Sequence, residues 1–175
     1  MVRILNIQND GDEMEAAIRE AMEIIDLYPK VFPHLAGQGF KLKKYFSKPN
    51  GGVVLQDGVV ITFEKSKSNS KIARKTFARK KKGDMIIHQI ASKERNGSAQ
   101  KVFNQFVEYC KSKGAGNILL TVRAFNEKAR KFYERYGFEY DSDINWNSKQ
   151  TGIIPGVIYR LKLEKIKSKE FFTLS

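Results

Sequence analysis

Hydrophobic positions along the chain follow two spacings, and each spacing predicts one kind of element. Dense runs of Val, Ile and Leu predict strands; they cover residues 2–7, two runs within 51–64, and residues 84–91, 117–124 and 157–163, and a further short strand is predicted at 138–143. Apolar residues three and four positions apart predict helices; they cover residues 12–28, 99–114 and 126–137. Residues 40–46 fit a short helix or a loop, and residues 144–156 are predicted to form a long loop.

Short polar signals indicate where several of these elements begin and turn. Asp57-Gly58 stands between two β-branched runs, which is a strong hairpin signal. Asp12 and Glu15 have the spacing of a capping box, with Asp12 as the N-cap. The order of elements predicts a mixed α/β (α+β) layer fold with an antiparallel first half and a β-α-β middle. We expect one domain over residues 1–163 and a C-terminal tail over residues 164–175.

The composition excludes several classes of protein. The chain has 175 residues, of which 41% are hydrophobic, enough for one domain with a core. It has no apolar run long enough to span a membrane, and its first residues lack the layout of a secretory signal. Cys110 is the single cysteine, which excludes an intramolecular disulfide and fits a reducing compartment. We therefore expect a cytoplasmic protein with no membrane contact.

The positive charge is concentrated in one segment. The net charge is +13, and nine Lys and Arg residues lie in the stretch from Lys65 to Lys82, which contains no acid. Such a field attracts polyanions. The stretch therefore predicts one of three roles: a solvated loop, a contact to nucleic acid, or a contact to a phosphate of a bound cofactor.

Two polar motifs each follow a predicted strand and open the next helix. The first is ERNGSA, residues 94–99, in which Gly97 lets the backbone approach a ligand closely. The start of a helix binds phosphate through its unpaired N–H groups and its dipole. The second motif begins at Asn126 and ends at Gly137, a typical helix stop. Asn126 and Tyr133 are seven positions apart, about two helical turns, and so lie on one face.

These motifs resemble those of the GNAT N-acetyltransferase superfamily. Its first pattern is Gln/Arg-x-x-Gly-x-Gly/Ala, and Gly97 and Ala99 match it, whereas Glu94 departs from it and the loop is about one residue short. Its second pattern is Asn-x-x-Ala-x-x-Phe-Tyr-x-x-x-Gly-Phe. This chain matches it at every position, with Asn126, Ala129, Phe132, Tyr133, Gly137 and Phe138. The resemblance covers about residues 52–163, and it implies a mixed, mostly antiparallel central sheet flanked by helices.

The resemblance implies acetyl-CoA as cosubstrate and assigns roles around it. The pyrophosphate would lie on the turn formed by Arg95, Asn96, Gly97, Ser98 and Ala99. The backbone of Ile90 and Ala91 would hold the pantetheine amides and polarise the thioester carbonyl. Asn126 would contact the pantetheine arm or only cap the helix. Tyr133 would protonate the departing thiolate as general acid, or be only a core aromatic with a satisfied hydroxyl.

The acceptor amine must lose a proton before it attacks, and two residues could take it. His88 on the strand 84–91 has a suitable unperturbed pKa, although it also fits a histidine bonded only within the fold. Glu64 at the end of the hairpin is the competing base. No metal site is expected, because His34 and His88 have no ligand spacing. Cys110 lies on the apolar face of its helix, and Trp146 either lines the acceptor pocket or anchors a loop.

The sequence therefore predicts direct acetyl transfer from acetyl-CoA to a primary amine. The acceptor is unknown; the basic stretch suggests nucleic acid or a nucleic-acid-associated substrate, such as a DNA base or an aminoacyl-tRNA. The alternative is a non-catalytic nucleic-acid-binding protein that keeps the fold. The protein is expected to be a monomer or a homodimer.

Overall fold

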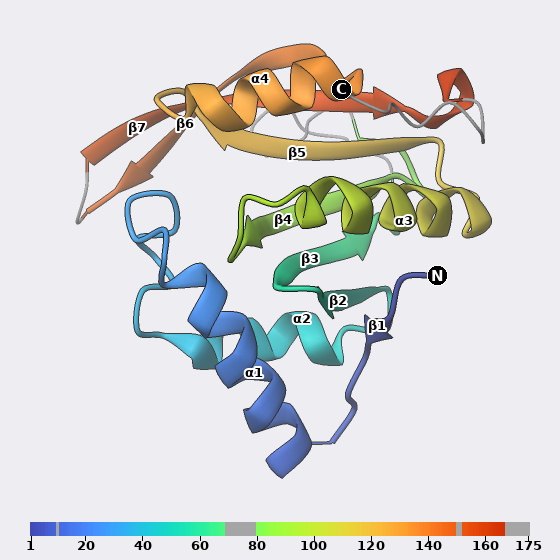
Figure 1. Cartoon of the computed structure of the whole chain (residues 1–175). Coiled ribbons are helices and arrows are strands. Elements are labelled where there is room, and N and C mark those ends of the chain that lie inside the picture. Colours follow the sequence, from blue (N-terminus) through green and yellow to red (C-terminus); the bar gives the residue numbers. More distant parts are fainter. Residues whose placement is uncertain (10, 69–79, 150–151, 167–175) are drawn as a thin grey trace.

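Seven strands form one sheet in the order β1-β2-β3-β4-β5-β7-β6. The structure, a computed structural model, describes residues 1–9, 11–68, 80–149 and 152–166 (Figure 1). The strands are β1 (Ile4–Leu5), β2 (Gly51–Gln56), β3 (Val59–Lys65), β4 (Met85–Ser92), β5 (Asn117–Arg123), β6 (Glu139–Ser148) and β7 (Gly152–Lys162). The α-helices are α1 (Asp12–Ile25), α2 (Lys43–Ser47), α3 (Ser98–Ser112) and α4 (Glu127–Tyr136), with 3₁₀ turns at Gly39–Leu42 and Leu163–Lys165.

Every neighbouring pair of strands is antiparallel except β4 and β5, which are parallel. A parallel pair needs a crossover connection, and α3 supplies it. This arrangement confirms the predicted mixed, mostly antiparallel fold with a β-α-β middle.

The helices cover the two faces of the sheet separately (Figure 1). On one face α3 and α4 bury a core rich in aromatic rings, among them Phe103, Phe106 and Tyr136. On the other face α1 and α2 pack against β2, β3 and the end of β4, around Met14, Ile25 and Phe46. Burying a large apolar side chain stabilises the fold by about 1.5–3 kcal/mol, so both faces contribute to holding the sheet.

The Asp57-Gly58 hairpin is confirmed. Both residues have positive φ, 51° at Asp57 and 69° at Gly58, as a two-residue turn with the right twist requires. The turn sets the register Gln56↔Val59 between β2 and β3. Residues 40–46 form the 3₁₀ turn and α2, which confirms the helical alternative for that segment.

Two predictions near the N-terminus are wrong. The N-cap of α1 is Gly11, and no side chain caps it. Asp12 is instead the first helical residue, where its charge favours the helix dipole without bonding the backbone. The first strand is only Ile4–Leu5, because β1 pairs with β2 at two positions.

The predicted long loop over residues 144–156 is also wrong. β6 runs to Ser148 and pairs along its length with β7, which begins at Gly152. Pro155 lies inside β7, one residue before the ladder to β5 begins at Gly156, and on that side only its carbonyl is bonded, by the Ala124 N–H at 3.0 Å. A proline is tolerated where one side of a strand has no ladder.

Most of the basic stretch, residues 69–79, lies outside the described residues. Its ends lie near β3 and β4, where the Lys65 ammonium group contacts the Lys113 carbonyl and the Lys81 N–H bonds Asp84 at 2.8 Å. Contact of this stretch with nucleic acid therefore stays a prediction. No helix in the described part of the chain is long and apolar enough to cross a membrane.

Candidate functional site

A cavity of about 400 Å³ opens where the parallel strands β4 and β5 separate. The two strands pair at only three positions, from Met85↔Ile118 to Ile87↔Leu120. Beyond Ile87 the edge of β4 faces the gap instead of a neighbouring strand. Ligands of α/β sheets bind outside the carboxyl ends of parallel strands, and the cavity lies at this place.

A β-bulge in β4 places the first polar residues in the cavity. Thr62 pairs with Gln89 and Phe63 with Ile87, which leaves His88 as an extra residue. Consequently Ile90 packs on the same core as Ile87, although a regular strand would place them on opposite faces. Bulges re-aim side chains and recur next to active sites.

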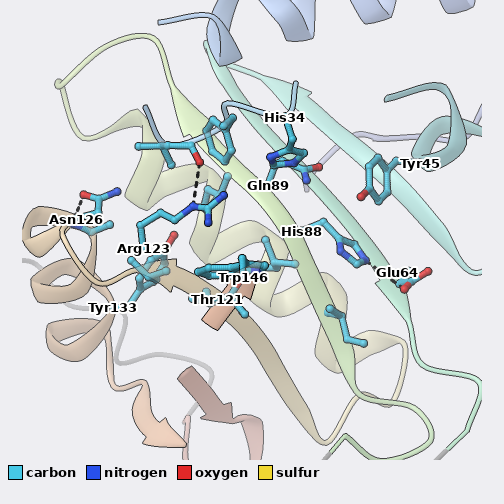
Figure 2. Close-up of a pocket in the computed structure, with 18 of the residues that line it drawn as sticks. His34, Tyr45, Glu64, His88, Gln89, Thr121, Arg123, Asn126, Tyr133 and Trp146 are labelled. Atoms are coloured by element: carbon cyan, nitrogen blue, oxygen red, sulfur yellow. Dashed lines mark hydrogen bonds and ion pairs between the residues drawn. The ribbon is translucent and has the colours of Figure 1, made fainter. Parts of the chain in front are cut away.

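His88 lies against a carboxylate and a ring. Its Nε2 is buried, makes no well-aligned hydrogen bond in the described part of the chain, and lies 3.2 Å from Glu64 Oε1 (Figure 2). The Tyr45 ring lies 5.0 Å from the His88 ring, centre to centre. The Oε2 atom of Glu64 contacts the Lys48 ammonium group. The sheet and α2 therefore bring the two predicted bases, His88 and Glu64, together.

The charges around this pair set its protonation state. Burial lowers the pKa of His88 below its ordinary value, and Glu64 only partly offsets this. For Glu64, burial acts to raise the pKa, but the Lys48 hydrogen bond and the charge of His88 lower it overall. At neutral pH His88 is therefore a neutral imidazole beside a carboxylate, the state that a general base requires.

At α4 the cavity is lined by Asn126, Ala129 and Tyr133. The Asn126 side chain accepts a hydrogen bond from the Ala129 N–H at 3.3 Å, so its N-cap role is confirmed. Tyr133 is 5% exposed, and in the described part of the chain its hydroxyl has no hydrogen-bond partner. Burial raises the pKa of Tyr133, which keeps the proton on the phenol.

The turn 94–99 lies at the start of α3, outside the lining of the cavity. Gly97 is the N-cap with a left-handed φ of 86°. Asn96 accepts hydrogen bonds from the Ser98 N–H at 3.1 Å and from its hydroxyl, and donates one to Glu94 at 2.6 Å. The turn is therefore built by its own side chains, and Glu94 adds a negative charge to it. Arg95 is exposed and Ala99 half-buried.

The segment that follows α1 covers the cavity and is tied to both strands at the gap. The Tyr28 hydroxyl donates to the Ser92 carbonyl at the end of β4, at 2.5 Å. Arg123 Nε, at the end of β5, donates to the Val31 carbonyl at 3.5 Å. His34 on this segment lines the cavity together with His88, so two histidines distant in sequence meet at one site.

Arg123 and Trp146 form a stacked pair in the cavity wall (Figure 2). The guanidinium carbon lies 4.2 Å from the centre of the Trp146 ring. Trp146 extends from β6 over Gly156 of β7, which is the register partner of Arg123. Trp146 therefore lines the cavity and packs within the β6–β7 pair, so its interpretation as the anchor of a long loop is wrong. The sequence did not lead us to predict Arg123 as a site residue. The signal that could have indicated it is its position at the end of a predicted strand, just before the helix of the second motif.

Replacing Gly156 by alanine is expected to displace Trp146. The added Cβ would lie 2.1 Å from Cζ3 of the ring and 2.9 Å from the Val122 carbonyl oxygen. Overpacking of this kind destabilises by about 1–3 kcal/mol. We expect a lower Tm and a changed emission spectrum of Trp146, the one tryptophan of the chain. The control is Gly116→Ala, whose Cβ meets only Asp84 Oδ1 at 3.9 Å; equal spectra and Tm for both variants would contradict the stacking.

Ala91, predicted to present its backbone to a ligand, packs its side chain in the α1 and α2 core, and only Ile90 lines the cavity. Cys110 is fully buried, which confirms its place on the apolar helix face, and burial raises the pKa of its thiol. Within the residues that the structure describes, no group of three His, Cys, Asp or Glu side chains could hold a metal ion.

A family model matches part of this chain. The model of the Acetyltransferase (GNAT) family matches residues 76–138. A search of curated protein sequences found no match. Among solved structures, a probable acetyltransferase from Staphylococcus epidermidis superposes with a TM-score of 0.67 at 13% identity, covering 93% of this chain and 98% of that one.

Two further solved structures are similar. The ribosomal-protein-S18-alanine N-acetyltransferase from Escherichia coli has a TM-score of 0.62 at 14% identity, over 98% of this chain and all of that one. NAA60 from Arabidopsis thaliana, in complex with acetyl-CoA, has a TM-score of 0.64 at 11% identity, over 93% and 98%. At such identities the likeness shows the fold. The resemblance to the GNAT superfamily that the two motifs predict is therefore confirmed, since residues 76–138 match its family model and the described chain has the GNAT fold.

Proposed function

We propose that this protein is an acyl-CoA-dependent N-acyltransferase that transfers an acetyl group directly from acetyl-CoA to a primary amine. The observation that carries the proposal is the cavity in the β4–β5 gap, which Tyr133 lines from α4 and which His88 and Glu64 line from β4 and β3. A proton donor and a proton acceptor thus reach one space from opposite sides of a split sheet.

The start of α3 would hold the cofactor phosphates. Gly97, the N-cap, has no side chain of its own to bond the helix; Asn96 bonds the Ser98 N–H, and an added Cβ at Gly97 would meet nothing within 4 Å. Backbone can therefore approach a phosphate here, with the helix dipole favouring the negative charge. From this turn an extended pantetheine arm would follow the open edge of β4 at Ile90 and Ala91, pairing with backbone groups as an added strand does.

The chemistry follows from the two ends of the cavity. The amine nitrogen attacks the thioester carbonyl carbon, and its proton passes to His88, or to Glu64 in the competing assignment. The C–N bond forms, the C–S bond breaks, and the thiolate takes the proton of Tyr133, which solvent later replaces. Backbone N–H groups near Ile90 and Ala91 would stabilise the oxyanion. Asn126, as the cap of α4, would position Tyr133 and border the pantetheine.

The test has two steps. Acetyl-CoA is expected to raise the Tm of the full chain, because a ligand that binds only the folded state stabilises it. Labelled acetyl-CoA is then incubated with amino acids, peptides, polyamines, aminoacyl-tRNA and DNA, and transfer of the label identifies the acceptor. Absence of any stabilisation by acetyl-CoA would refute the proposal at the first step.

Replacing Gly97 by glutamate is expected to abolish most of the stabilisation by acetyl-CoA. A like charge about 4 Å from a phosphate costs about 1–4 kcal/mol, so affinity should fall by about tenfold or more. Gly97→Ala is the matched control, because it carries the same strain at φ 86° without the charge. Titration of both variants by calorimetry separates the two effects, and equal affinities would show that the phosphates bind elsewhere.

A further inference from the structure

Arg123 brings a positive charge into the cavity that the described residues do not balance. No Asp or Glu oxygen lies within ion-pair distance of it, and its Nη1 is buried without a hydrogen-bond partner in the described part of the chain. Among the residues that the structure describes, its one hydrogen bond is the 3.5 Å contact from Nε to the Val31 carbonyl. The segment 69–79 contains no Asp or Glu either, so it brings no carboxylate to this charge.

The surroundings of Arg123 are positive or neutral. His34, on the covering segment, has its pKa lowered by burial and by the charges of Arg123, Lys41 and Lys44. Lys80 also lines the cavity. Glu64 is the one acid among the described lining residues, and it contacts Lys48 and His88. The β5 side of the cavity therefore favours an anion and repels a second cation.

The stacked pair of Arg123 and Trp146 is held in position without a ligand. Trp146 lies between the guanidinium of Arg123 and the backbone of Gly156, where a Cβ would collide with the ring. Stacking on an aromatic face leaves the edge of the guanidinium available to donate hydrogen bonds, and its fork of N–H groups matches a carboxylate. A preorganised cation of this kind binds without the cost of ordering a long side chain.

We propose that Arg123 recognises a carboxylate of the acceptor, so that the substrates are small amines that carry a carboxylate, as amino acids do. This inference rests on the proposed function, since the acceptor amine must point to His88 on β4 while the carboxylate reaches Arg123 on β5. The two groups lie on opposite strands of the gap, and such an acceptor would bridge them. Polyamines and other purely cationic amines would be poor substrates.

The position of Trp146 supplies a direct readout, because it is the single tryptophan and contacts Arg123. The full chain is saturated with coenzyme A, and its emission is followed while α-amino acids, β-alanine and γ-aminobutyrate are each titrated beside their carboxamides. Within each pair, the acid and its carboxamide have the same amine and differ only in the carboxylate. We expect the carboxylates to change the emission with about tenfold or greater preference, as a charge-assisted hydrogen bond implies.

Variants of Arg123 complete the test. Arg123→Gln should abolish the preference for carboxylates, and Arg123→Lys, which keeps the charge but not the fork, should retain part of it. The comparison of each acid with its amide uses the wild-type protein, so it remains a valid test even if a substitution at Arg123 destabilises the fold.

Several outcomes would overturn the inference: amides that bind as well as acids, an unchanged preference in Arg123→Gln, or responses only to polyamines or nucleic acid. If no carboxylate-bearing amine changes the emission while acetyl-CoA still raises the Tm, the inference fails and the proposed function stands. If acetyl-CoA gives no stabilisation, the proposed function fails, whatever the emission shows.

Discussion

Replacing Tyr133 by phenylalanine is expected to lower kcat by about 100-fold or more while leaving stability nearly unchanged. A positioned general acid contributes about 10²–10⁴-fold, and Tyr133 is the buried phenol of α4 that lines the cavity. Its hydroxyl has no hydrogen-bond partner among the described residues, so its removal breaks no bond in the fold. Steady-state kinetics and thermal unfolding measure the two effects on one sample.

Tyr136→Phe is the matched control on the same helix. Tyr136 is also buried, but its hydroxyl donates to Asn104 Oδ1 at 2.7 Å and does not line the cavity. Its loss should cost about 1 kcal/mol of stability with kcat nearly unchanged. The two variants are thus expected to show opposite patterns, one losing activity and the other stability.

The leaving thiol gives a second test of the role of Tyr133. An acyl donor whose thiol is more acidic needs less help from a general acid, so it should recover part of the activity lost in Tyr133→Phe. If the variant is as slow with such a donor as with acetyl-CoA, Tyr133 acts by position rather than by proton transfer.

Replacing His88 by alanine is expected to lower kcat/KM at neutral pH by about 100-fold, the usual scale of a general base. In the wild type, activity should be constant above the pKa of His88 and fall as the pH drops through it. Burial lowers that pKa from its ordinary value near 6.5, so the fall should lie below pH 6.5. In His88→Ala this acidic limb should disappear from the pH–rate profile.

Glu64→Gln separates the two candidate bases. Glu64 acts to raise the pKa of His88, whereas burial, Lys48 and Lys44 lower it. Without the carboxylate the pKa should fall further, and the acidic limb should move to lower pH with the plateau largely kept. If Glu64 is itself the base, the plateau will collapse instead.

His34→Ala is the control for this profile, because His34 is the other histidine of the cavity and also has a lowered pKa. Its loss should leave the acidic limb in place. A limb that disappears with His34 and persists without His88 would assign the base to the covering segment.

Features set by a few adjacent residues could be predicted from the sequence. Asp57 and Gly58 both adopt positive φ because a two-residue hairpin requires it, and the Asn126 cap and the Gly137 stop follow from bonds within one helical turn. The second GNAT motif also depends on residues close together in the sequence, so it could be recognised from the sequence alone. The pairing of His88 with Glu64 was partly predictable, since both lie on predicted strands.

The rest depends on contacts between distant segments. Only parts of β6 and β7 were predicted, at 138–143 and 157–163, because residues 144–148 and 152–156 have no strand pattern of their own and form strands by pairing with each other. The stack of Trp146 on Arg123 needs three strands in register, with Gly156 between them. The separation of β4 from β5, which forms the cavity, could not be predicted from the composition of either strand.

The bulge at His88 also restricts how this sequence can change in length. One extra residue inverts the alternation of β4, so that Ile90 faces the α3 core and Ala91 faces the α1 core. Losing residue 88 or 89 would remove the bulge: Ile90 and Ala91 would keep their partners on β3, but no extra residue would be left to turn a side chain toward Glu64. The exposed turn 93–97 is under no such register constraint. We therefore expect homologous chains to vary in length after β4 and to keep its residue count.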